Sequence, residues 1–166
     1  MKRGIVVVFC LVLTTSCIFD NWGEPTSTVD PIWSRFDPVT LTRTEFENSI
    51  EIRENIPVTE SSKIYIIGDY IFVNDKRTGF HIFDNTDPAN PIKKKFLKIP
   101  GATDIAIRNN ALYINQATDL VVLTIDHNTF QVDVKKRLKD VFPELRSPDG
   151  EYYSENDKVV VNWIQK

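Results

Sequence analysis

Residues 63–101 read KIYIIGDYIFVNDKRTGFHIFDNTDPANPIKKKFLKIPG, and residues 103–139 read TDIAIRNNALYINQATDLVVLTIDHNTFQVDVKKRLK. Both stretches follow one plan: a hydrophobic strand, a polar turn, an aromatic strand, a third strand and a lysine-rich segment. Phe72 and Tyr113 hold the same place 41 positions apart, and Phe80 and Leu120 are 40 apart. A period near 40 with about four short strands per unit is typical of a propeller blade. We therefore expect a mostly β fold: a partial β-propeller of two four-stranded blade-like repeats plus part of a third, with one short N-terminal helix.

Turn formers separate the expected strands. Gly68-Asp69 and Asn109-Asn110 divide the first two strands of each repeat. The run 84–91 (DNTDPANP) is dense in turn residues, and its two prolines cannot donate to a sheet, so it is predicted to be a loop. The expected strands are 63–67, 70–74, 79–84, 93–98, 103–107, 111–115, 119–125, 130–137 and 158–163.

The N-terminus has the layout of a secretory signal peptide. Lys2 and Arg3 precede an apolar run, 4–13, which is too short for a transmembrane helix of roughly 20 residues. LTTSC (13–17) resembles a bacterial lipobox, in which the chain is cut before the cysteine and lipidated there, although Leu13 lies four residues before Cys17 instead of the usual three. We predict a signal peptide over 1–16 and lipidation at Cys17. The alternative is an ordinary secreted protein with a chance cysteine at the cut site.

Composition argues against sites built on a cysteine thiol and against nucleic-acid binding. The two cysteines are Cys10, inside the leader, and Cys17, so the exported body would hold no free thiol and no disulfide. Loss of the two basic residues of the leader takes the net charge from −3 to −5. This acidic balance argues against a nucleic-acid partner, whose footprint is usually strongly basic.

The chain divides into four expected parts. After the leader, residues 17–40 carry three prolines and little periodicity and are predicted to be a tether from the lipid, with Trp33 and Phe36 packing on the domain edge and Trp22 left open. Residues 41–55 hold the short helix, centred on 42–52, where Thr42 and Glu45 have capping-box spacing. The β-propeller-like repeat domain fills 56–166.

The turn of the first repeat resembles a motif of a known family. GFHIFDNTDPANP (79–91) looks like the hallmark of LVIVD-type propeller repeats, in which a strand runs into an Asp-x-Ser/Thr-Asp/Asn-Pro-x-x-Pro turn. Residues 99–126 resemble a second such repeat, although 124–128 lacks the Asp and Pro of that turn. Together with TRTEFENSI, NIPVTESSKIYIIGDYIFVN and VFPE, the chain is similar over roughly 40–163 to envelope lipoproteins of Bacteroidetes-type bacteria. The resemblance implies the fold and brings no assigned activity.

The number of repeats falls short of a ring. Propellers close with about four to eight blades, and this chain holds two full units plus a partial third ending in KVVVNWI (158–164). We expect first a truncated member of the family. The alternatives are association with a second chain, or cover of the open side by the helix and tether.

Few residues suggest chemistry. His81 and His127 lie in a strand and a turn, and no nucleophile elbow, HExxH motif or glycine-rich phosphate loop is present. Asp84, Asp87 and Asn90 could suggest a calcium loop, but Lys95 stands where a Glu would be needed. We therefore predict no catalytic residue, no metal and no cofactor, and leave the ligand-binding residues unknown.

Two surface features remain candidates for binding. The basic clusters, 93–98 and 135–139, hold matching places in the repeats; they are either a stripe facing anionic lipid or polysaccharide, or lysines that protect outer edge strands. Tyr152 and Tyr153 either line a recognition surface or start the third unit.

These features predict a non-catalytic, lipid-anchored protein of the bacterial cell envelope, at the outer membrane, with the periplasmic or surface face undecided. Its partners would be the membrane, through the lipid on Cys17, and an envelope protein or polysaccharide; oligomerisation is open. The alternatives are a truncated remnant or structural subunit without a ligand of its own, and a propeller hydrolase.

Overall fold

The computed structural model describes residues 35–126 and 128–166. The predicted signal peptide, the lipidation site Cys17, residues 17–34 of the tether with Trp22 and Trp33, and His127 lie outside the described residues. Those predictions are therefore not addressed by the fold.

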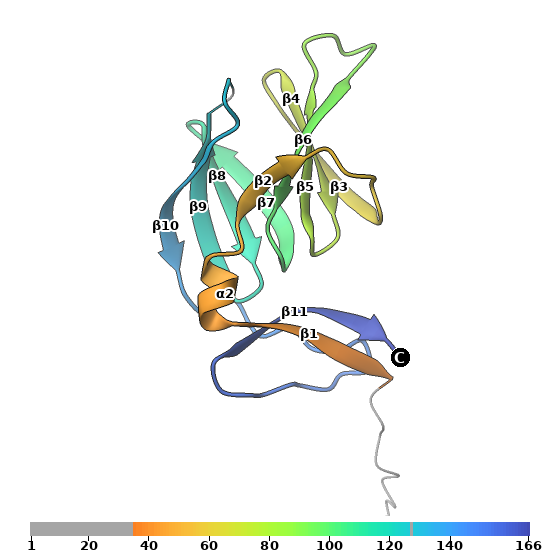
Figure 1. The fold of residues 1–166 in the computed structure, drawn as a ribbon, viewed down its shortest axis with the longest axis vertical. Coiled ribbons are helices and arrows are strands. Elements are labelled where there is room, and N and C mark those ends of the chain that lie inside the picture. Colours follow the sequence, from red (N-terminus) through yellow and green to blue (C-terminus); the bar gives the residue numbers. More distant parts are fainter. Residues whose placement is uncertain (1–34, 127) are drawn as a thin grey trace, which may run out of the picture. The chain divides into compact units, whose positions relative to one another are not determined.

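The described residues form three antiparallel sheets and one short helix (Figure 1). The elements in chain order are β1 (Phe36–Thr42), α2 (Arg43–Glu47), β2 (Glu51–Glu54), β3 (Ser61–Ile67), β4 (Tyr70–Asp75), β5 (Gly79–Asp84), β6 (Ile92–Lys98), β7 (Ala102–Arg108), β8 (Ala111–Gln116), β9 (Asp119–Ile125), β10 (Val132–Leu138) and β11 (Lys158–Gln165). The sheets have the strand orders β2-β6-β5-β4-β3, β10-β9-β8-β7 and β1-β11. The mostly β prediction is confirmed, and each of the nine expected strands is present within two residues of its predicted bounds.

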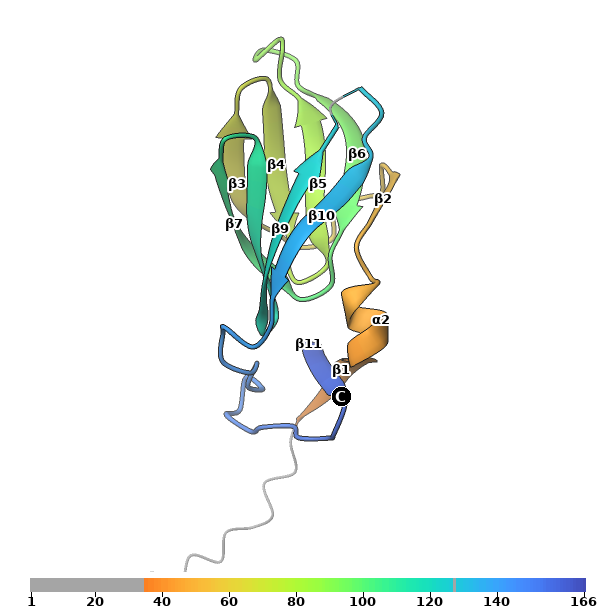
Figure 2. The same cartoon turned by 90° about the vertical axis from the view of Figure 1, so that its left-hand side faces the viewer.

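Each sequence repeat folds into one four-stranded meander. We call β3–β6 blade 1 and β7–β10 blade 2. β2 adds a fifth strand beside β6, so the chain must cross one face of blade 1 to reach β3 at the opposite edge. Figure 2 shows the two blades face to face, with β3 and β7 on the same side. The described residues include no closed ring of blades.

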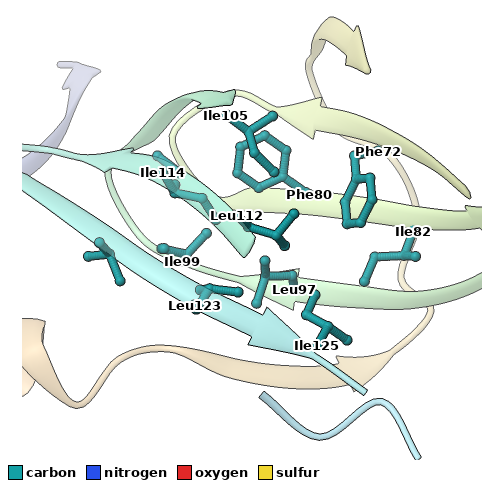
Figure 3. Close-up of a cluster of buried hydrophobic side chains, with 12 residues drawn as sticks. Phe72, Phe80, Ile82, Leu97, Ile99, Ile105, Leu112, Ile114, Leu123 and Ile125 are labelled. Carbon is teal, nitrogen blue, oxygen red and sulfur yellow. The ribbon is translucent and has the colours of Figure 1, made fainter. Parts of the chain in front are cut away.

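The main core lies between the two blades (Figure 3). Residues 72, 74 and 80 share one face of blade 1 by strand alternation and cross-strand pairing, and the apolar members of that face meet the alternating isoleucines, leucines and valines of blade 2. Twelve buried side chains form this cluster: Phe72, Phe80, Ile82, Leu97, Ile99, Ala102, Ile105, Leu112, Ile114, Val121, Leu123 and Ile125.

One glycine is required by close backbone approach. Gly79 has φ +154°, and a Cβ atom there would lie 2.0 Å from the carbonyl oxygen of Leu97. β5 and β6 can pair closely at this point only without a side chain at position 79. Gly68, in the β3–β4 turn, has φ +52° but open space around it.

The helix is shorter than predicted. The capping box is present: the backbone N–H of Thr42 donates to Glu45 Oε2 at 2.9 Å, and the backbone N–H of Glu45 donates to the Thr42 hydroxyl at 3.2 Å. The helix ends at Glu47, because Asn48 Nδ2 and Ser49 Oγ bond the carbonyls of the last turn. The prediction of a helix over 42–52 is wrong beyond Glu47, since residues 51–54 form β2 against blade 1.

The end of the predicted tether is also part of the fold. Residues 36–40, which we assigned to the tether, lie in β1, and Phe36 is half-buried. β1 pairs along its whole length with β11, the strand predicted to belong to a third unit. β11 thus obtains its strand partner from the N-terminal side of the described chain.

Candidate functional site

An apolar pocket opens between the blades at the end where their first hairpins turn. Its volume is about 220 Å³ and its lining is mostly apolar. Ligand pockets usually hold about 300–1,000 Å³, so this one suits a single inserted side chain better than a complete metabolite. It is lined by Ile67, Gly68, Asp69, Tyr70 and Phe72 of blade 1 and by Ile107, Asn110, Leu112 and Ile125 of blade 2.

Tight turns place the rim of this pocket. Asn109 and Asn110 both have positive φ (49° and 60°), which matches the two-residue turns that suit the twist of a hairpin and that favour asparagine. Gly68 supplies the positive φ of the equivalent turn in blade 1. The turn residues that the sequence marks as equivalent therefore lie on opposite sides of one opening.

A polar bridge joins β3 to β7 on the same side of the two blades. Lys63 Nζ lies 2.5 Å from Asp104 Oδ2, and the hydroxyl of Tyr65 donates to Asp104 Oδ1. Burial and this hydrogen bond raise the pKa of Tyr65 to about 12. Tyr65 is therefore a neutral donor to the carboxylate at all ordinary pH values.

A buried carboxylate fixes the segment that precedes β3. Asp75 accepts hydrogen bonds from the Thr59 backbone (2.9 Å) and hydroxyl (2.7 Å), from the Glu60 N–H (2.8 Å) and from His81 Nε2 (3.0 Å). Burial raises the pKa of Asp75, but the hydrogen bonds from these three residues outweigh it, so its pKa lies well below the ordinary value. His81 is fully buried, and its ring packs on Phe96 with centroids 4.8 Å apart. Asp75 and His81 therefore lie under residues 55–60, the segment that connects β2 to β3, away from solvent.

A second buried carboxylate holds the helix to blade 2. Arg43, the first helical residue, donates to both oxygens of Asp119, at 3.1 and 2.6 Å. Arg137 donates to Asp119 Oδ2 at 2.9 Å, and the Asp140 N–H donates to Oδ1 at 3.1 Å. Both guanidinium groups also lie over the ring of Phe46, at 5.5 and 5.2 Å from its centroid. We call this group, Arg43, Phe46, Asp119, Arg137 and Asp140, the clasp.

The electrostatics of the clasp favour the ionised carboxylate. Burial raises the pKa of Asp119, but hydrogen bonds from the Asp140 backbone, Arg137 and Arg43 outweigh it and leave the pKa below its ordinary value. The side chain of Asp119 has no exposed surface, so its negative charge is balanced by the two arginines and not by water. The clasp therefore serves folding more readily than chemistry on a solvent-borne substrate.

Several members of the two basic clusters are paired within the fold. On β6, Lys95 and Lys98 pair with Glu54 and Glu51 of β2, at 2.5 and 2.9 Å. The interpretation of β6 as an outer edge strand is wrong, because β2 pairs with it and takes the edge. β10 is an edge strand, but its Arg137 belongs to the clasp and is only 10% exposed.

The remaining candidate loops are occupied by their own hydrogen bonds. Asp84 Oδ1 accepts from the N–H (3.0 Å) and hydroxyl (2.6 Å) of Thr86, and Asp87 accepts from Ala89 N–H and Asn90 Nδ2. Within residues 35–126 and 128–166, no group of three or more His, Cys, Asp or Glu side chains lies together as a metal site would require. Nor does that part of the chain contain a helix long and apolar enough to cross a membrane.

Tyr152 and Tyr153 are held by different neighbours. Tyr152 is exposed, with the Arg146 guanidinium over its ring at 4.2 Å, and Tyr153 donates to Glu155. Neither residue lines the pocket between the blades. They lie before β11, in a segment to which no helix or strand is assigned.

Sequence reasoning missed the buried ionic groups. Asp75 and Asp119 have the composition of surface residues, and nothing local marks their burial. One signal was available: Asp119 stands where the first repeat has Gly79, so an acid replaces a residue that must have no side chain. A charged residue at a position of such close packing indicates that a partner must reach it from elsewhere in the chain.

Comparison with known proteins agrees with the first repeat. A family model described as the LVIVD repeat matches residues 60–96, which contain β3, β4, β5 and most of β6. No curated protein and no solved structure matches the chain significantly. Blade 1 therefore carries an LVIVD repeat, which fits an LVIVD-repeat protein and is consistent with a propeller.

Proposed function

We propose that the chain is a non-catalytic, lipid-anchored binding scaffold of the bacterial cell envelope that holds a partner protein at the pocket between its blades. The observation that carries the proposal is the pocket itself: an apolar opening of about 220 Å³ framed by two equivalent hairpin turns. Interface anchors are commonly single apolar or aromatic side chains seated in such desolvated pockets.

The chemistry of the lining favours a protein over a polysaccharide. Sugars carry hydroxyl groups that need several convergent hydrogen-bonding partners, whereas this pocket presents mainly isoleucine, leucine and aromatic surface. A leucine, methionine or phenylalanine side chain of a partner would fill it. The polar rim, with Asp69 and Asn110, would then contact the backbone around that anchor.

The buried ionic groups support binding over catalysis. The carboxylates of Asp75 and Asp119 are saturated by protein donors inside the fold. A general acid or base must come within hydrogen-bond reach of its substrate, and these groups face the protein interior instead. The hydrolase alternative draws no support from them.

Photo-crosslinking in the expressing cell tests the partner site. Benzoylphenylalanine replaces Tyr70, on the pocket rim, in one variant and the exposed Tyr152, outside the pocket, in the matched control. We expect a protein adduct from position 70 alone, and its loss when Ile107→Asp places a charge in the lining. Equal adducts from both positions, or an adduct that contains only sugar, would contradict the proposal.

Metabolic labelling tests the anchor separately. Radiolabelled palmitate should enter the chain and remain in the Cys10→Ser variant, because that cysteine belongs to the predicted leader. The Cys17→Ser variant should carry no label and should leave the membrane fraction. Label that persists in Cys17→Ser would refute the lipid anchor without bearing on the pocket.

A further inference from the structure

Each blade has one face buried against the other blade and one outer face. By repeat position, the outer face of blade 1 corresponds to the buried face of blade 2, and the outer face of blade 2 corresponds to the buried face of blade 1. The cross-strand pairs fix the alignment: Ile66 pairs with Ile71 in blade 1 as Ile107 pairs with Leu112 in blade 2. Positions in β3 and β4 therefore correspond to positions 41 residues later. Those in β5 correspond to positions 40 residues later in β9, as Val73–His81 and Ile114–Val121 show.

One face of blade 2 is buried against blade 1, and its equivalent in blade 1 is open at its upper end. The buried face of blade 2 consists of Ile105, Ile107, Leu112, Ile114, Val121 and Leu123. The equivalent positions on the outer face of blade 1 are Ile64, Ile66, Ile71, Val73, His81 and Phe83. Ile105 is 4% exposed, but its counterpart Ile64 is 65% exposed and Ile66 is 67% exposed. The pattern is therefore covered in blade 2, whereas in blade 1 only Ile64 and Ile66 are uncovered, because the end of the face with the fully buried His81 lies under the segment between β2 and β3.

The outer face of blade 2 repeats the other half of the same interface. Tyr65, Phe72, Phe80 and Ile82 of blade 1 pack on blade 2. Their equivalents are Ala106, Tyr113, Leu120 and Val122, which lie on the outer face. Ala106 replaces the larger Tyr65, and a hollow of about 360 Å³ lies there, lined by Ala106, Tyr113, Leu120 and their neighbours. This hollow offers space for side chains the size of Ile64 and Ile66.

Charge complementarity repeats in the same way. Lys63 and Asp104 are equivalent positions, 41 residues apart, and they form an ion pair between the blades at 2.5 Å. If the uncovered β3 side of blade 1 in another copy met blade 2 as blade 2 meets blade 1, its Lys63 would face Asp104 again. Lys63 of each β3 would then lie beside Asp104 of the next β7, so each new contact brings opposite charges together.

We propose that the outer face of blade 1 in one copy binds the outer face of blade 2 in another copy, so that chains associate head to tail. The contact is heterologous, because two different faces meet, and such contacts either close into rings or continue as filaments. Ile64 and Ile66 are the anchors on one side, and Ala106 with Tyr113 forms their seat on the other. This inference does not rest on the proposed partner pocket, which lies between the blades of a single copy.

Directed disulfide cross-linking of the full chain in the expressing cell tests the geometry. One tagged copy carries Ile66→Cys and a differently tagged copy carries Tyr113→Cys, at the counterparts of Ile107 and Phe72, which line one pocket between the blades. The matched control is Ile164→Cys, at an isoleucine of β11 that is 53% exposed. The unmodified chain, with Cys10 and Cys17, gives the background.

We expect an adduct of two chains that carries both tags, and a ladder of larger adducts when one chain carries both new cysteines. Adding Ile64→Arg to the Ile66→Cys chain should reduce the adduct about 30-fold, as expected for loss of a buried interface anchor. Circular dichroism checks that this exposed substitution leaves the strands folded.

Three results would overturn the inference. A self-adduct of Ile66→Cys, or of Tyr113→Cys, would mean that like faces meet. An adduct with a different protein would mean that another occupant covers the face. A yield no higher than that of Ile164→Cys would mean that the faces do not meet at all. None of these results depends on partner capture at Tyr70, so failure of the pocket and failure of the association remain distinguishable.

Discussion

Replacing Asp119 by asparagine should destabilise the protein by about 3 kcal/mol. The asparagine keeps the shape of the side chain but removes the negative charge that two guanidinium groups share at 2.6 and 2.9 Å. Arg43 and Arg137 are only 20% and 10% exposed, so both would keep a poorly solvated charge. Breaking a buried ion pair by removing one partner costs about 3–5 kcal/mol. The lower end applies, because Arg43 retains Glu47 at 2.7 Å.

Urea unfolding followed by circular dichroism and tryptophan fluorescence measures this loss. In a separate thermal unfolding experiment, a change of about 3 kcal/mol should lower the melting temperature by roughly 10 °C for a domain of this size. Asp133→Asn is the matched control, since that aspartate lies on the neighbouring β10 with its side chain 62% exposed, and its loss should cost under about 0.5 kcal/mol. A loss of less than about 1 kcal/mol for Asp119→Asn would mean that the two arginines do not depend on this carboxylate.

A double-mutant cycle shows whether the clasp acts as a unit. Arg43→Met and Asp119→Asn should each destabilise the protein, but the double variant should be more stable than the sum predicts by about 1–3 kcal/mol. Additive losses would mean that the two side chains act through separate contacts. Loss of the clasp should loosen α2 from blade 2, because Arg43 bonds Asp119 and Phe46 lies under the Arg137 guanidinium there.

Three further predictions concern the blades. Gly79→Ala should cost more than about 3 kcal/mol or prevent folding, because its Cβ would lie 2.0 Å from Leu97 O, whereas Gly68→Ala, with open space, should cost about 1 kcal/mol; thermal unfolding compares them. Asp75 has a pKa below the usual 3.8 in the folded protein, so the unfolded chain takes up the proton first as pH falls. Stability from this group is thus full above about pH 5 and declines as pH falls toward the folded pKa, and Asp75→Asn should flatten urea-derived stability between about pH 5 and 2. Lys63→Ala removes an ion pair whose partners are half exposed, so its unfolding free energy should change by under about 1 kcal/mol.

The repeat architecture gives these features a common origin. Blade 1 and blade 2 share strand register residue by residue, but the positions that close their lower ends differ. Blade 1 has Asp75 with His81 there, and blade 2 has Asp119 with two arginines. Each carboxylate binds a segment from outside its own four-stranded unit: Thr59 and Glu60 in one case, and α2 in the other. Divergence at the blade ends thus attaches the flanking segments, and the shared faces carry the packing.

The sequence was sufficient for the elements of the blades. Alternating apolar residues define β3 to β9, and the Gly68 and Asn109-Asn110 turns define where each meander reverses, because these signals act over a few neighbouring residues. The equivalence of Phe72 with Tyr113 was likewise visible as a period. The capping box at Thr42 and Glu45 was predicted correctly, since both partners lie within one turn of helix.

Tertiary structure alone decided which distant segments meet. Nothing local distinguishes residues 36–40 from a tether, and β1 exists because β11, more than 110 positions away, offers it an unpaired edge. Residues 51–54, which were expected to be helical, form β2 instead, because β6 offers them an unpaired strand edge. Asp119 and Arg43 have the composition of surface residues and become a buried pair only when folding brings them together across 76 positions. Periodicity fixes which side chains share a face, but burial depends on what packs against that face, and the pairing of distant edges and charges is a property of the assembled chain.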